Sequence, residues 1–121
     1  MTRKHLAIAS GMAIAVLLPI ASVHGDHELN DLKPFLKQNC FECHGPEKQK
    51  NDLRFDTLGI DLSDKRTLEV WQEILDQLNL GEMPPKKKPQ PPRDKVNKVV
   101  DALTARLKIA YAEQRSTGGK T

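Results

Sequence analysis

One pentapeptide, Cys40-Phe41-Glu42-Cys43-His44, constrains this chain more than any other stretch. It has the Cys-x-x-Cys-His spacing at which a c-type haem is attached. The two thiols would add across the vinyl groups of the haem, and the imidazole directly after them would bind the iron from one side. The chain has no other cysteine. The sequence therefore predicts one covalently attached haem c, and with it a protein that carries one electron at a time.

Other uses of the same five residues stay open. A redox dithiol, a structural disulfide and a zinc site would each use Cys40 and Cys43. With His44, the zinc reading supplies only three ligands, whereas structural zinc usually takes four. A cytosolic dithiol is less expected because the beginning of the chain indicates export, and haem is joined to such motifs outside the cytoplasm.

The beginning of the chain has the pattern of a secretory signal peptide. Arg3 and Lys4 are followed by a run of mostly apolar residues, and Gly25 is a small residue suited to cleavage. We therefore expect a periplasmic or otherwise exported protein. An uncleaved N-terminal membrane anchor is the alternative, since the apolar run can just span a bilayer. The predicted parts are a signal peptide over 1–25, a single domain over 26–115 and a disordered tail over 116–121.

Charge and aromatic content limit the possible partners and the size of the core. The formal net charge is +3, and loss of Arg3 and Lys4 with the signal would bring it close to neutral. A balance of this kind does not favour nucleic-acid binding. Only 4% of the residues are aromatic, so a haem would have to supply much of the core. We expect the chain without haem to be poorly folded.

The periodicity of apolar residues predicts an all-α chain with about three main helices and long loops. The first helix is expected to start near Asp31, because Pro34 fits only in a first turn, and to run into the pentapeptide. The long loop over about 46–62 is expected to wrap one edge of the haem, since a loop of that length in a small domain needs a reason.

Two further helices follow the long loop. The first of them is predicted to be capped by Ser63 or Thr67 and to stop at Gly81. The other is predicted to begin near Pro92 or Arg93, with proline at its first position.

Met83 is the candidate for the second axial position of the iron. It would be the only methionine left after signal cleavage, and it lies in a proline-rich loop directly after a helix. A thioether is a soft, weakly basic donor that stabilises the reduced iron. The alternatives are that Met83 only fills a gap in the core and that His27 is the ligand instead. A haem-based sensor or enzyme, in which a small molecule displaces Met83, is the functional alternative.

Three further features carry weaker predictions. Arg54 would pair with a haem propionate, or remain a solvated charge. Trp71 would pack against the haem edge, or belong to the core. The run Lys86-Lys87-Lys88 would steer an acidic redox partner onto the exposed haem edge, or form an ordinary solvated loop.

The chain resembles class I cytochromes c, and more narrowly the planctomycete-type cytochrome c domain. The resemblance implies a small all-α fold around one covalent haem, with Cys40 and Cys43 as thioether anchors. It implies His44 and Met83 as axial ligands, and electron transfer without enzymatic activity. The residues that carry it are Cys40-Phe41-Glu42-Cys43-His44-Gly45-Pro46, Asp52-Leu53-Arg54-Phe55-Asp56-Thr57, Trp71 and Leu80-Gly81-Glu82-Met83-Pro84-Pro85.

The resemblance also implies that the first and last helices cross beside the haem. Phe35 or Leu36 would then pack against Leu107 or Tyr111. Two features depart from the family pattern. Such domains often head much longer proteins, so a free carrier and a piece of a larger enzyme both remain open. Many class I cytochromes also orient the ligand histidine through a proline carbonyl, and Pro46 is too close to His44 for this role.

Overall fold

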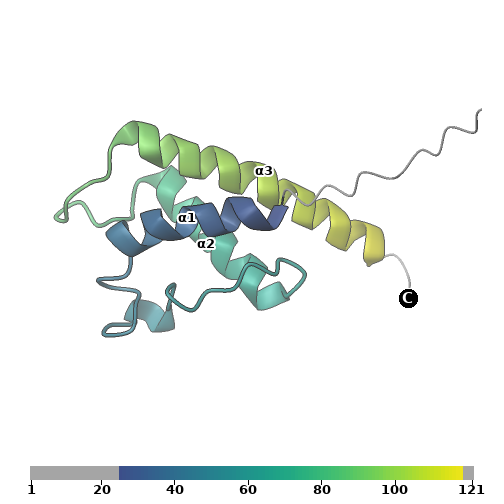
Figure 1. Cartoon of the computed structure of the whole chain (residues 1–121), viewed down its shortest axis with the longest axis horizontal. Coiled ribbons are helices and arrows are strands. Elements are labelled where there is room, and N and C mark those ends of the chain that lie inside the picture. The colour runs from purple at the N-terminus through teal and green to yellow at the C-terminus, as the bar shows by residue number, and fades with distance from the viewer. Residues whose placement is uncertain (1–24, 119–121) are drawn as a thin grey trace, which may run out of the picture.

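A computed structural model describes residues 25–118 of the chain (Figure 1). Within this range the prediction of an all-α fold with three main helices is confirmed, and no β-strand is present. The predicted signal peptide over 1–25 lies outside the described residues except for Gly25, and residues 119–121 lie outside them as well. The elements are α1 (Gly25–Asn39), the short 3-10 helix η1 (Lys50–Asp52), α2 (Lys65–Leu80) and α3 (Arg93–Thr117).

Both α1 and α2 pack on α3, and α1 runs beside α3 in Figure 1. All three helices contribute to one apolar core, and the first and last helices pack together as the resemblance implied. Leu36 of α1 and Leu107 of α3 are almost completely buried in this core. None of the helices between residues 25 and 118 combines the length and apolar composition that a bilayer crossing requires. The core side chains with least exposure are Trp71, Leu29, Leu36, Leu103 and Leu107.

The predicted start of the first helix near Asp31 is wrong, because α1 begins at Gly25 and contains Pro34 in its interior. Proline there removes one backbone hydrogen bond from the helix. The helix nevertheless continues across it, because Leu29 and Leu32 are buried on the same core as Leu36. Packing of an apolar face contributes more to helix stability than local propensity does.

The ends of α2 are set by local hydrogen bonds. The carboxylate of Asp64, rather than Ser63 or Thr67, caps the first turn by accepting the Thr67 N–H at 2.7 Å. Gly81 ends the helix, as predicted, in the left-handed conformation with φ 68°. Glycine tolerates this conformation without steric cost. These two ends place the Met83 loop directly after α2.

The last helix starts as predicted and ends later than predicted. Its first residue is Arg93, and Pro92 stands at the N-cap rather than at the predicted first position. The helix includes Ser116 and Thr117, the first two residues of the predicted disordered tail. Their hydroxyls donate to the Glu113 carbonyl at 2.7 and 3.2 Å, bonds that complete the last turn of α3.

The Asp64 cap leads to a prediction about pH. Hydrogen bonds from the Thr67 N–H and hydroxyl hold the pKa of Asp64 below its usual value of 3.8. The cap therefore stabilises the fold above that pH, and its contribution is lost as the pH falls below it. Asp64→Ala should melt at a lower temperature than the parent protein at pH 7, and the gap should narrow in acid.

The matched control is Asp64→Asn, which keeps a capping acceptor but does not titrate. It should retain most of the stability of the cap at both pH values. Thermal unfolding followed by circular dichroism measures all three proteins. A gap between Asp64→Ala and the parent protein that stays constant from pH 7 down to pH 2 would contradict this role of Asp64.

Candidate functional site

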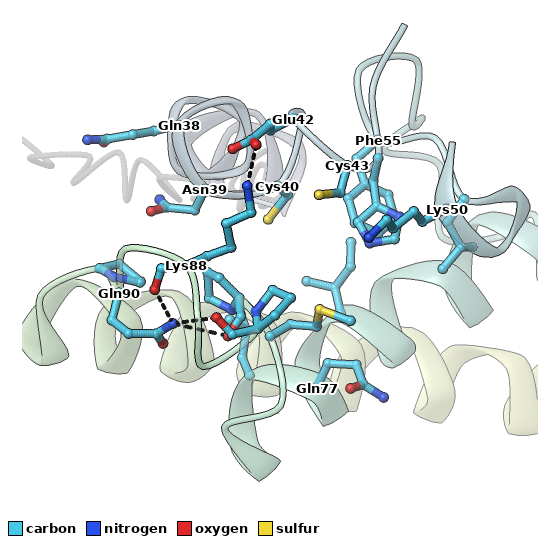
Figure 2. A pocket seen from close by; sticks show the side chains of 18 of the residues that line it. Gln38, Asn39, Cys40, Glu42, Cys43, Lys50, Phe55, Gln77, Lys88 and Gln90 are labelled. Atoms are coloured by element: carbon cyan, nitrogen blue, oxygen red, sulfur yellow. Dashed lines mark hydrogen bonds and ion pairs between the residues drawn. The ribbon is translucent and has the colours of Figure 1, made fainter. Parts of the chain in front are cut away.

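A cavity of about 460 Å³ lies between the end of α1, the loop after it, α2 and the proline-rich loop before α3 (Figure 2). Its volume is within the range of roughly 300–1,000 Å³ found for ligand and cofactor pockets. Four of the six predicted site residues line it, although Met83 is far from the others in the sequence. These four are Cys40, Cys43, His44 and Met83.

His44 is held firmly in the cavity wall. Its residue is 7% exposed, and its ring stacks on Phe55 with 4.8 Å between ring centroids and 26° between ring planes. The His44 N–H donates to the Cys40 carbonyl at 2.9 Å, and the His44 carbonyl accepts the Phe55 N–H at 2.8 Å. These contacts fix the imidazole from both the backbone and the ring face.

The Nδ1 atom of His44 is buried and has no hydrogen-bond partner. No hydrogen-bond acceptor for the second imidazole nitrogen could be predicted from the sequence, and the structure shows none for Nδ1. A buried polar atom without a partner costs about 1–3 kcal/mol. Buried side-chain atoms of this kind are few, and each needs an explanation such as an ordered water or a bound group.

The two thiols lie on the turn that follows α1. The Cys40 N–H donates to the Leu36 carbonyl at 2.8 Å, and the Cys43 N–H donates to the Cys40 carbonyl at 3.1 Å. Both cysteines are unbridged. Burial, together with the neighbouring Cys43, raises the pKa of the Cys40 thiol to about 11. Reactive thiols usually have lowered rather than raised pKa values, so Cys40 does not have the character of a reactive thiol.

The zinc alternative finds no support either. Across residues 25–118, no three side chains of His, Cys, Asp or Glu converge in a way that could hold a metal ion. Cys40, Cys43 and His44 thus line a shared cavity without closing around a common point.

Met83 faces the cavity from the loop that follows α2. The backbone N–H groups of Glu82 and Met83 both donate to the Gln77 carbonyl, at 3.1 and 3.4 Å. Met83 is half-buried, and its loop continues into the cavity-lining residues Pro84 and Pro85. The end of α2 therefore determines where the thioether enters the cavity. The other possible ligand, His27, has a side chain outside the described residues.

Comparison with known families adds one match. Residues 40–87 match the family model described as planctomycete cytochrome C. This match supports a planctomycete-type cytochrome c domain over residues 40–87. No curated protein and no solved structure is significantly similar to the chain. The matched range includes His44 and Met83 and all of α2, whereas α1 and α3 lie outside it.

A cytochrome c domain indicates haem binding and electron transfer, and such domains are typically not enzymes. The cavity fits that indication. Two thiols, a buried imidazole with an unpartnered nitrogen and a thioether line one space whose walls are largely apolar. Leu53, Phe55, Ile74, Leu78 and several prolines supply these walls. A large apolar ring with one polar edge suits such a space better than a small polar molecule does.

The backbone beside the histidine leaves no room for a side chain at Gly45. A Cβ atom there would lie 2.3 Å from the Phe41 carbonyl oxygen, which is a backbone atom and moves only with the whole turn. The Gly45 N–H also donates to the Lys48 carbonyl at 2.8 Å. Glycine at this position allows the turn of the cytochrome c domain to close directly after His44.

We therefore predict that Gly45→Ala destabilises the protein by about 1–3 kcal/mol, the usual cost of overpacking. It should also weaken the haem spectrum, because the turn that moves carries His44. The matched control is Gly59→Ala, whose added Cβ would be 3.7 Å from its nearest neighbour, the Thr67 hydroxyl. Chemical denaturation and visible spectra measure both variants. Equal behaviour of the two would contradict the steric argument.

Two of the predicted site residues do not line the cavity. Arg54 is held instead by Asp56, since Nε and Nη2 donate to the two carboxylate oxygens, each at 2.9 Å. Trp71 is fully buried in the core, and its Nε1 donates to the Gly59 carbonyl at 2.9 Å. Arg54 therefore pairs with an acidic neighbour and does not line the cavity. Trp71 belongs to the core, which was the alternative to packing against the haem edge.

Other residues at the cavity were not singled out from the sequence as cofactor contacts. Phe55 belongs to a motif that carries the family resemblance, but its stacking on His44 depends on a loop that returns from the next segment. The ion pair between Glu42 and Lys88 joins residues far apart in the chain, and Gln90 bonds to carbonyls of its own loop. Spacing along the sequence gives no signal for contacts of this kind.

Proposed function

We propose that this chain transfers single electrons through one haem c attached to Cys40 and Cys43, with His44 and Met83 on opposite sides of the iron. The observation that supports it most is the convergence of these four side chains on one cavity. The bound haem would supply an iron that takes up and releases one electron. Everything else required of the protein is to hold that group and to limit its contact with water.

The cavity walls are suited to these tasks. Phe55 stacks on His44 and keeps its ring from rotating. Leu53, Ile74 and Leu78 present apolar surface that would exclude water from the haem. A thioether donor and a dry surrounding both favour the reduced iron, so we expect a higher reduction potential than that of a haem with two imidazoles.

The N-terminal signal pattern favours a place outside the cytoplasm, and membrane attachment only if that segment is retained. Redox partners with acidic surfaces are the expected partners, because Lys86 and Lys87 are exposed beside the cavity-lining loop. Lys88 is part of this basic run, but its ammonium pairs with Glu42 at 2.5 Å. Lys86 and Lys87 are therefore the lysines of this run that we propose for partner docking.

The test is a visible spectrum of the exported protein, made in a host that attaches haem, in the oxidised and reduced states. We expect sharp low-spin bands on reduction, reversible redox titration and colour that remains with the protein after acid–acetone extraction. In the control, Cys40→Ser with Cys43→Ser, any colour should be extracted. A colourless parent protein, or one that releases all its haem, would overturn the proposal.

Carbon monoxide distinguishes electron transfer from sensing. With Met83 on the iron, the reduced protein should bind carbon monoxide weakly unless it is denatured. Ready binding by the native protein would favour the alternative in which a small molecule displaces Met83.

A further inference from the structure

The loop between α2 and α3 is held together by one side chain. Nε2 of Gln90 lies 3.2 Å from the Pro84 carbonyl oxygen, 3.0 Å from that of Pro85 and 3.0 Å from that of Lys88 (Figure 2). Prolines have no N–H to donate, so a loop rich in them has carbonyls with few backbone partners. The Gln90 amide replaces those missing donors.

These bonds begin at the residue after Met83. On its other side, Met83 is joined to the end of α2 through the Gln77 carbonyl. The backbone around the thioether is therefore restrained from both directions. Without the bonds of Gln90, residues 84–91 would keep a single backbone–backbone hydrogen bond, from the Lys88 N–H to the Pro85 carbonyl at 2.8 Å.

Lys88 extends this network to the haem-attachment segment. Its carbonyl accepts from Gln90, while its Nζ pairs with the Glu42 carboxylate across the cavity mouth (Figure 2). Glu42 lies between the two cysteines. The pair is substantially exposed, and ion pairs of that kind contribute little on their own. Gln90 is exposed as well, but its amide reaches three carbonyls of the loop rather than one carboxylate.

We propose that Gln90 is a positioning residue for Met83, which keeps the thioether in place by fixing the backbone carbonyls of the following loop. The proposal rests on the proposed function, because it requires Met83 to be bound to iron. Release of Met83 from the iron would then require the clamp of Gln90 on Pro84, Pro85 and Lys88 to loosen. The clamp thus sets how readily an external ligand competes with the thioether.

The experiment measures the affinity of the oxidised full-length haem protein for imidazole, which competes for the position of Met83. Gln90→Leu should bind imidazole about tenfold more tightly than the parent protein, as expected for the loss of one to two net hydrogen bonds on a solvent-accessible loop. Its reduction potential should also fall. Gln90→Glu repeats the test with a side chain of the same shape that accepts but does not donate.

Two controls separate positioning from general stability. Gln72→Leu removes an amide that bonds Asp76 on α2, at 2.8 Å, and should bind imidazole as the parent protein does. In a Met83→Leu background, Gln90→Leu should change imidazole affinity by less than about twofold, because an effect exerted through Met83 disappears with Met83.

Unchanged affinity in Gln90→Leu, or an effect that persists in the Met83→Leu background, would overturn the inference. So would failure of both Gln90 variants to give folded haem protein, since the clamp would then support the fold as a whole. Failure here is distinct from failure of the proposed function. A parent protein with stable His44 and Met83 ligation but no effect of Gln90 would refute the positioning role alone.

Discussion

Met83→Ala is expected to lower the reduction potential by tenths of a volt, a substantial part of the range of about 0.8 V that axial ligands span. Removing the thioether removes the donor that favours the reduced iron and opens one axial position. The reduced variant should therefore bind carbon monoxide, and its oxidised spectrum should shift toward a high-spin form. Potentiometric titration with visible spectra measures both effects.

These measurements distinguish the two interpretations of Met83 that the sequence left open, an iron ligand and a side chain that only fills a gap in the core. A methionine that only fills a gap would change stability without changing the spectrum. Met83→Leu is the matched variant, because it keeps most of the apolar volume but cannot bind iron. Met83→Leu should resemble Met83→Ala in potential and carbon monoxide binding. If both variants keep the parent spectrum and potential, Met83 is not a ligand.

Trp71→Ala is expected to reduce the free energy of unfolding by about 3–5 kcal/mol, the usual cost of truncating a buried aromatic side chain. Trp71 is 0% exposed, and its indole N–H donates to the Gly59 carbonyl. A loss of this size is large beside a total stability of about 5–15 kcal/mol for a small domain. Chemical denaturation of the haem protein measures it.

Trp71→Phe should cost less, because it keeps most of the apolar volume and loses mainly the hydrogen bond to Gly59. Since Trp71 does not line the cavity, both variants should retain the potential and spectrum of the parent in the folded fraction. A large shift in potential with little loss of stability would show instead that Trp71 acts on the haem.

The sequence was most informative where a short segment carries the whole signal. The Cys40 to His44 spacing needs no knowledge of the fold, and the glycine at Gly81 ends a helix through its own conformation. The three helices also followed from periodicity, because burial of one face leaves a regular pattern. Local rules failed at Pro34, where core packing on both sides of the proline outweighed its preference for a first turn.

The surroundings of the site could be predicted less well, because they depend on residues brought together by folding. Arg54 has the right chemistry for a propionate, but the sequence does not reveal that its guanidinium is held by Asp56 two residues away. The clamp of Gln90 and the ion pair of Lys88 with Glu42 depend on the path of a proline-rich loop. The periodicity of apolar residues does not predict the path of this loop.

Met83 is proposed to bind the haem iron through its sulfur, on the side opposite the imidazole of His44. This ligation is tested most directly by proton NMR of the reduced, diamagnetic protein with methyl-labelled methionine. We predict one methionine methyl resonance shifted far upfield by the ring current of the haem, and its loss in Met83→Leu. Methionine methyl resonances that all remain at ordinary positions, in a protein with a low-spin haem, would contradict the account.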